Sequence, residues 1–242
     1  MHILSIGNSF SVDATTYLHD MAKRSGKDIN TANLCIGGCS LEKHFRNYLA
    51  DNRDYTLQFN GVGTGFRFSI REALLSHPWD VVTIQQVSHQ SPYPDTYTPY
   101  IEFLVGEIRK LCPKVKLLIH KTWAYEEGSE RLFKTARFET SDAMFEAITN
   151  AYEKAALATN VDGIIPAGDV MFRLSKANVG LVHRDTFHAS LGIGRYAVAM
   201  TWLRYLTGVD VTENDFSDTA EPVSEEQMAA VKGIVSGIVP LA

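Results

Sequence analysis

The chain has 242 residues, a formal net charge of -5 and a pI near 5.9. This length suits one α/β domain with a sizeable core, and the acidic balance excludes the basic surface that nucleic-acid binding needs. No apolar run is long enough to span a membrane, and the first residues show no basic segment followed by a cleavage site. We therefore expect a cytoplasmic protein, or an exported one if an N-terminal signal has been removed.

Short β-branched runs alternate along the chain with longer amphipathic patterns, which predicts a mostly parallel sheet with helices on both faces. Strands are predicted at residues 3–6, 29–35, 81–85, 115–120 and 163–165. Helical patterns follow residues 11–13 and occupy residues 41–49, 70–76, 100–111, 142–159 and 190–206. Glycines separate residues 55–59 from 66–68, which predicts a small hairpin inserted between the second and third strands.

We expect a single domain over residues 1–242, with residues 209–242 as a C-terminal extension. A helical pattern at residues 224–239 lies in that extension. This helix packs either on the body of the domain or on a second subunit, and the sequence leaves a homodimer open. The three cysteines, Cys35, Cys39 and Cys112, have neither paired spacing nor histidine partners, so we expect reduced thiols and no metal.

A serine and an Asp-x-x-His pair lie beside the ends of predicted elements. Ser9 follows the first strand at a strand-to-helix turn, and Asp185 and His188 precede the helical pattern of residues 190–206. Ligands bind doubly wound sheets at the carboxyl ends of the strands. A serine becomes a nucleophile when an imidazole takes its proton and a carboxylate orients that imidazole. We therefore interpret Ser9, His188 and Asp185 as a catalytic triad.

Each of these motifs also has a simpler interpretation. Ser9, Ser11 and Asp13 are all good helix-capping residues, and a solvated histidine often follows a capping aspartate. The turn at residues 8–15 also suits a bound phosphate or FMN, although no glycine-rich loop with a lysine follows it. The occurrence of both motifs at one edge of the sheet favours catalysis.

Other strand ends carry groups that suit an ester substrate. Gly38 follows the second strand, where a bare N–H can approach a substrate oxygen, although the glycine taken alone favours a tight turn that needs a positive φ. Gln85 and Gln86 finish an apolar strand, and we interpret one of their amides as an oxyanion donor. Ser88, Trp123 and Tyr125 follow later strands and are interpreted as substrate-binding residues, with ordinary packing as the alternative for the aromatics.

Together these residues resemble the SGNH hydrolases, the GDSL esterase and lipase superfamily, in an uncharacterised bacterial branch. The superfamily's Gly-Asp-Ser block is matched by Gly7-Asn8-Ser9, its oxyanion glycine by Gly38, and its Asp-x-x-His block by Asp185 and His188. The third block departs from the pattern, since Gln85 and Gln86 stand where the family has Gly-x-Asn-Asp. The resemblance spans roughly residues 1–208.

The resemblance implies a flavodoxin-like three-layer α/β/α sandwich around a mostly parallel five-stranded sheet. It also implies an acyl-serine mechanism with no metal and no cofactor. Ser9 would attack the ester, His188 would move the proton and Asp185 would orient His188. The N–H groups of Ser9 and Gly38, with an amide from Gln85 or Gln86, would form the oxyanion hole.

The polar and aromatic groups at the predicted edge suit a polyhydroxyl leaving group, and no amphipathic lid typical of a lipase is present. We therefore expect an esterase for short-chain, acetyl-type esters on a carbohydrate or glycoconjugate, with no nucleic-acid or membrane partner. Two alternatives stay open. One is a flavodoxin-like module that binds FMN or phosphate, and the other is a pseudo-enzyme that binds carbohydrate without turnover.

Overall fold

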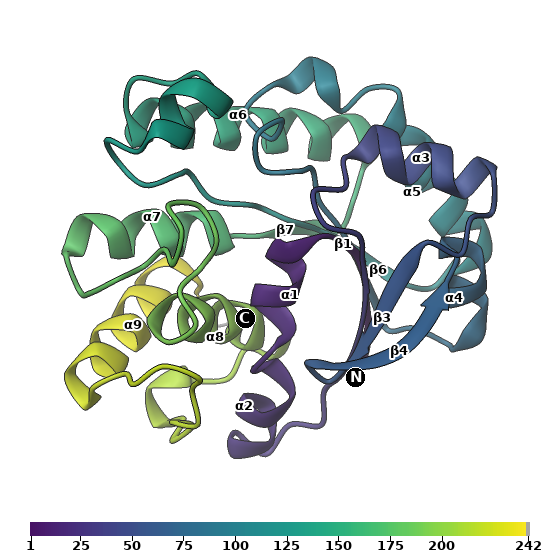
Figure 1. Cartoon of the computed structure of the whole chain (residues 1–242). Helices are drawn as coiled ribbons and strands as arrows, with labels where there is room; N and C mark the ends of the chain where they lie inside the picture. The colour runs from purple at the N-terminus through teal and green to yellow at the C-terminus, as the bar shows by residue number, and fades with distance from the viewer. Residues whose placement is uncertain (241–242) are drawn as a thin grey trace.

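The apolar runs of the sequence form the centre of one mixed sheet, ordered β4-β3-β2-β1-β5-β6-β7 (Figure 1). The computed structural model describes residues 1–240. The strands are β1 (His2–Gly7), β2 (Asn30–Cys35), β3 (Tyr55–Phe59), β4 (Val62–Phe68), β5 (Val81–Ile84), β6 (Lys116–His120) and β7 (Gly163–Ile165). All five predicted strands pair in parallel, and they lie in the chain order 2-1-3-4-5 of a doubly wound sheet. These strands are largely buried because helices cover both faces, although β2 carries the buried polar residues Thr31 and Asn33.

The predicted sheet of five strands is wrong, because the described sheet has seven. The hairpin expected as a separate insertion joins this sheet: β3 pairs antiparallel with β2, and β4 pairs antiparallel with β3. Without β3, the outer edge of β2 would leave a row of backbone N–H and C=O groups unpaired. The sequence did not reveal this pairing because β4 is largely exposed and carries Gly63 and Gly65, so it lacks an apolar pattern.

Helices form a layer on each face of the sheet (Figure 1). They are α1 (Ser9–Thr15), α2 (Leu18–Arg24), α3 (Leu41–Leu49), α4 (Ile70–Ser76), α5 (Tyr100–Leu111), α6 (Ser141–Thr159), α7 (Ala167–Ala177), α8 (Ile193–Thr207) and α9 (Glu225–Ile238), with the short turns η1 (Pro94–Thr96), η2 (Leu132–Ala136) and η3 (Val211–Glu213). Helices α1, α2, α7, α8 and α9 pack together in one layer, and α3 to α6 form the other. The helical pattern expected after residues 11–13 falls in two short helices, α1 and α2, and α7 was not predicted. Among residues 1–240, no helix is both long enough and apolar enough to span a bilayer.

The last predicted helix, α9, packs on α7 and α8 of its own chain. Val231 and Val235 are its buried side chains. The buried Arg204 of α8 reaches across and donates through Nε to the Val239 carbonyl at 2.5 Å. The described part of the predicted extension is therefore fastened to the body of the protein.

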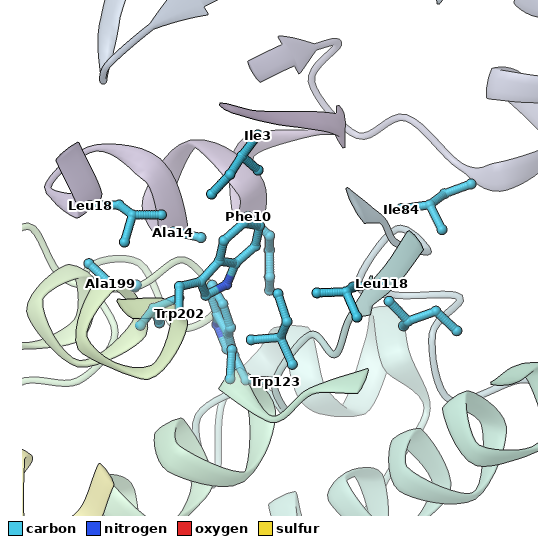
Figure 2. Close-up of a cluster of buried hydrophobic side chains, with 14 of the residues drawn as sticks. Ile3, Phe10, Ala14, Leu18, Ile84, Leu118, Trp123, Ala199 and Trp202 are labelled. Carbon is cyan, nitrogen blue, oxygen red and sulfur yellow. The ribbon is translucent and has the colours of Figure 1, made fainter. Parts of the chain in front are cut away.

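Helix α1 is fixed by a buried aromatic contact between the sheet and α8 (Figure 2). The Phe10 ring stacks on the Trp123 ring with centroids 4.2 Å apart, and both side chains are almost completely buried. Ala14, one turn further along α1, lies in the same cluster near Ala199 and Trp202 of α8 in Figure 2. Because α1 is so short, this packing rather than helix propensity holds its first residues in place.

Candidate active site

Ser9 is the first residue of α1 and follows β1 after a single intervening residue. That residue, Asn8, caps the helix: its Oδ1 accepts the Phe10 N–H at 3.1 Å. The turn is tight, since a Cβ added at Gly7 would lie 2.6 Å from the Ser11 hydroxyl oxygen. The hydroxyl of Ser9 therefore lies at the carboxyl edge of the sheet, at a helix N-terminus where, among residues 1–240, the Ser9 N–H has no partner.

His188 and Asp185 reach this hydroxyl from the loop that precedes α8. The Nε2 atom of His188 lies 2.8 Å from Ser9 Oγ, and its Nδ1 atom lies 2.6 Å from Asp185 Oδ2. The other carboxylate oxygen of Asp185 accepts the backbone N–H of His188 at 2.8 Å. Since a carboxylate can only accept from Nδ1, this network assigns the proton to Nδ1 and leaves Nε2 free to accept from the serine.

The carboxyl group of Asp185 has a pKa below its ordinary value. Burial acts to raise this pKa, but the hydrogen bonds from the His188 side chain and backbone and the charge of His188 outweigh it. Asp185 is therefore ionised at neutral pH, which is the form that holds the imidazole in the orientation described above.

The buried carboxylate of Asp13 fastens the histidine loop to α1. Asp13 lies one helical turn after Ser9 and is fully buried. Its oxygens accept from Arg184 Nη1 at 3.0 and 3.1 Å, from Arg195 Nε at 2.8 Å and from the Ala189 N–H at 3.2 Å. The two arginines flank residues 185–188, so both ends of the loop are tied to the helix that carries the serine.

From the sequence, Asp13 was expected only to cap a helix, and Arg184 and Arg195 were not predicted as its partners. The available signal was an acidic residue four positions after Ser9, hence on the same face of an otherwise buried helix. A buried carboxylate requires cationic or N–H partners, and two arginines lie on either side of the Asp-x-x-His motif.

A second set of contacts holds the tip of the loop from the opposite side. The backbone N–H of Glu126 donates to the Thr186 carbonyl at 2.8 Å, and Trp123 Nε1 donates to the Phe187 carbonyl at 2.7 Å. Thr186 has a φ of 72°, an uncommon conformation for a residue other than glycine. The histidine loop is thus held between α1 and the segment that follows β6.

The backbone amides of Ser9 and Gly38 are free to bind a substrate oxygen. Within residues 1–240, neither amide donates a hydrogen bond. Gly38 has a φ of 62°, which favours glycine, and no atom would lie within 4 Å of an added Cβ. Both residues line the same cavity as His188.

The predicted oxyanion role of Gln85 and Gln86 does not fit where the structure places them. Both side chains are buried, and neither lines the cavity at Ser9. Gln85 Nε2 donates to Asn8 Oδ1 at 2.9 Å, and Gln86 Nε2 donates to the Thr96 carbonyl at 2.9 Å. These amides are buried, where each polar group needs a hydrogen-bond partner, and the neighbouring segments supply those partners.

The same network explains why asparagine replaces the family's aspartate at position 8. Asn8 Nδ2 donates to the Cys39 carbonyl at 3.1 Å while its Oδ1 accepts from Phe10 and Gln85. A carboxylate could not donate to that carbonyl. Gln85 Oε1 in turn lies 2.9 Å from Nδ1 of the buried His120. Asn8 therefore links the ends of β1, β5 and β6 to the loop that carries Gly38.

The cavity around Ser9 and His188 has a volume of about 330 Å³. Ser88 and Tyr125 line it as predicted, and their hydroxyl oxygens lie 2.9 Å apart. Trp123 does not line the cavity, so its predicted contact with substrate is wrong. It is fully buried because it packs on Phe10. Seven further residues line the cavity that were not among the predicted site residues: Asn8, Phe10, Gly37, Val87, His89, Arg131 and Phe187.

The cysteine thiols form no disulfide among themselves, and burial raises their pKa values. Burial raises the pKa of the Cys35 thiol to about 11, with a smaller contribution from Asp13, and the pKa of the Cys39 thiol to about 12. All three cysteines are free. Over residues 1–240, no group of three or more histidine, cysteine, aspartate or glutamate side chains is placed to hold a metal ion.

A family model described as a domain of unknown function, DUF4886, matches residues 2–233. The crystal structure of a DUF4886 family protein from Bacteroides uniformis is 32% identical with a TM-score of 0.90, and the match covers 100% of this chain and 96% of that one. A protein from Slackia heliotrinireducens, provisionally described as an SGNH hydrolase, is 24% identical with a TM-score of 0.62, over 85% of this chain and 98% of that one.

A mutant of an acetyl-xylooligosaccharide esterase from Geobacillus is 15% identical with a TM-score of 0.52, over 85% of this chain and 94% of that one. A search of curated proteins found no match. The structural likenesses show that the chain has the fold of the SGNH hydrolases, which confirms the resemblance inferred from its motifs.

The buried His120 gives the protein a specific sensitivity to acid. Burial lowers the pKa of His120 from 6.5 to about 3. Its Nδ1 donates to Gln85, and among the described residues Nε2 has no partner. A histidine that is neutral when folded but protonated when unfolded makes the unfolded state bind more protons. The free energy of unfolding should therefore fall as the pH drops below 6.5, until about pH 3.

Between neutral pH and about pH 4, we expect the free energy of unfolding of His120→Gln to fall by about 3 kcal/mol less than that of the wild type. Urea unfolding of both proteins across this range measures the difference. His44 and His183, whose pKa values burial also lowers, are unchanged in the variant and contribute equally to both curves. Parallel pH curves for the two proteins would contradict a neutral, buried His120.

Proposed function

Because the chain belongs to the DUF4886 family and has the fold of the SGNH hydrolases, we propose that it is a serine esterase. The observation that carries this proposal is the unbroken hydrogen-bonded path from Asp185 through His188 to Ser9. Ser9 and His188 are 179 positions apart in the sequence, and the buried Asp13 network brings them together. A histidine near a serine by chance would not need such support.

In the proposed reaction, Ser9 Oγ bonds to the ester carbonyl carbon while its proton moves to His188 Nε2. The ionised Asp185 stabilises the resulting imidazolium. The N–H groups of Ser9 and Gly38 bind the oxyanion of the tetrahedral intermediate. When the intermediate collapses, His188 returns the proton to the leaving alcohol. Water, deprotonated by His188, then attacks the carbonyl carbon of the acyl-serine; the bond to Ser9 Oγ breaks, His188 returns the proton to Oγ, and the acid is released.

We propose that Ser88 supplies the third oxyanion donor in place of the glutamines. Burial raises the pKa of Tyr125, against smaller lowering effects of Ser88 and Arg131, so the phenol keeps its proton at neutral pH. Tyr125 can then donate to Ser88 Oγ, which lies 2.9 Å from its hydroxyl oxygen. This leaves the Ser88 hydroxyl hydrogen free to point into the cavity that both residues line.

The cavity supports a small acyl group on a polar alcohol. Its volume of about 330 Å³ is at the lower end of the usual range for ligand sites. Hydroxyl, imidazole and aromatic groups surround Ser9, as suits an acetyl ester of a carbohydrate or glycoconjugate. The description of one structural neighbour as an acetyl-xylooligosaccharide esterase lends support. No observation favours either alternative. At the turn proposed to bind FMN or phosphate, the Ser9 hydroxyl is hydrogen-bonded to His188. Trp123, proposed to bind carbohydrate in a pseudo-enzyme, is buried and cannot stack on a sugar ring.

Ser9→Ala should abolish ester hydrolysis, by about 10⁴-fold or more, while leaving the fold intact. His188→Ala should be about as damaging, and the double variant little worse, because residues that act as one unit are not additive. Steady-state kinetics and intact mass after treatment with a fluorophosphonate measure this. The wild type should carry one adduct on Ser9, and so should Ser175→Ala, which removes an exposed serine of α7. An adduct on the Ser9→Ala protein would disprove the assignment.

Ser88→Ala should lower kcat by about a hundredfold with little change in KM, because its hydroxyl binds the oxyanion only in the transition state. Tyr125→Phe should lower kcat less, since the Ser88 hydroxyl remains. Fluorophosphonate should still label Ser9 in both variants. An unchanged kcat in Ser88→Ala would mean that the two backbone amides suffice.

Aryl esters with one leaving group and acyl chains from acetyl to octanoyl test the predicted acyl group. We expect kcat/KM to fall by about tenfold or more along the series, because a small cavity must expel the longer chain. Rates of alkaline hydrolysis correct for intrinsic reactivity. Faster turnover of octanoyl than of acetyl esters would overturn the substrate assignment and leave the triad in place.

A further inference from the structure

One permanently charged side chain lies in the wall of the cavity around Ser9, and it is Arg131. Among residues 1–240, no carboxylate lines this cavity. The lining histidine His89 has a lowered pKa, first because of burial and second because of the Arg131 charge. The same charge acts on Tyr125 across the cavity. Arg131 therefore places a fixed positive charge in the described lining of this cavity, in a chain whose overall charge is negative.

The charge of Arg131 has no partner among residues 1–240. Arg131 also lines an adjoining cavity of about 390 Å³, together with Glu130, Lys134 and Asp185. Both carboxylates there are already paired, Glu130 with Lys134 and Asp185 with His188. Arg131 thus has no ion-pair partner among the described residues, and it lines both the cavity around Ser9 and the adjoining cavity.

The position of this cation is fixed relative to the triad. The guanidinium carbon of Arg131 lies 3.9 Å from the centroid of the Phe187 ring. The carbonyl of Phe187 accepts a hydrogen bond from Trp123 Nε1. The centroids of the Phe187 and His188 rings are 3.8 Å apart. A guanidinium stacked on an aromatic face keeps its N–H donors at its edge, in a planar fork that matches a carboxylate.

We propose that Arg131 binds a carboxylate on the alcohol portion of the substrate, so that this enzyme deacetylates acidic sugars such as acetylated uronic acids. The proposal rests on the proposed esterase function and specifies its substrate class. A single cation matches a single negative charge. The acetyl group occupies the space beside Ser9, and the alcohol extends past Phe187 to the exposed Arg131. The carboxylate satisfies the free guanidinium there.

The test compares two acetate esters of nearly equal shape, para-acetoxybenzoate and para-acetoxybenzamide. After correction for alkaline hydrolysis, the wild type should have a KM about fivefold lower for the benzoate, and added salt should reduce this preference. Arg131→Gln should remove the preference, Arg131→Lys should retain part of it, and Arg131→Glu should invert it. Lys134→Gln is the matched control, because it removes an equal charge that is already paired with Glu130. It should keep the wild-type preference.

Acetylated glucuronic acid and acetylated glucuronamide should reproduce the same ranking on a sugar. Equal KM values for the charged and neutral probes in the wild type would overturn the proposal. So would an equal loss on both probes in Arg131→Gln, because Arg131 would then only pack on Phe187.

Calorimetry with the Ser9→Ala protein separates this proposal from the proposed function. There, para-acetoxybenzoate should bind about fivefold more tightly than the benzamide, and Ser9→Ala combined with Arg131→Gln should lose the difference. If the wild type hydrolyses no acetate but this binding difference is found, the result supports carboxylate binding by Arg131 and contradicts the esterase function. If both acetates are hydrolysed with no difference in binding, the result supports the esterase function and contradicts carboxylate binding by Arg131.

Discussion

The buried carboxylate of Asp13 is the contact on which the site depends. It joins the helix that begins with Ser9 to Arg184 and Arg195, which flank the loop that carries His188. Removing one partner of a buried ion pair typically costs about 3–5 kcal/mol, because the remaining charge is left without compensation. Two arginines and a backbone amide on one carboxylate therefore act as a strong constraint. They hold the loop where His188 Nε2 meets the serine.

The strand side of the site has its own buried support. Asn8 connects the Gly38 loop to Gln85, and Gln85 connects in turn to His120 at the end of β6. Each amide atom of Asn8 and Gln85 in these contacts needs a partner of defined polarity, and His120 Nδ1 supplies the donor for Gln85 Oε1. The two supports are independent. One holds the proton acceptor, and the other holds the turn and the loop whose amides face the cavity.

Most of the parallel part of the sheet was predictable because burial on both faces leaves nearly continuous apolar runs in β1, β5 and β6. The order of the triad motifs was predictable for a related reason, since reactive groups follow strand ends in doubly wound folds. Membership of β3 and β4 in the sheet was not predictable, because it depends on the open edge of β2 rather than on a pattern within the hairpin. Helix α7 was also missed. It begins after Pro166, in a segment whose structure is decided by packing on α8 and α9.

The sequence by itself determined which residues have the chemistry for an acyl-serine reaction, because Ser9, Asp185 and His188 are recognisable by type, order and spacing. Only the tertiary structure decided where the remaining side chains point. Gln85 and Trp123 lie beside the predicted edge in sequence, yet buried partners turn both away from the cavity. Arg131 lies in no recognisable motif, yet stacking on Phe187 places it at the cavity. The physical reason is that residue type limits what a side chain can bind, whereas its packed neighbours determine which direction satisfies it.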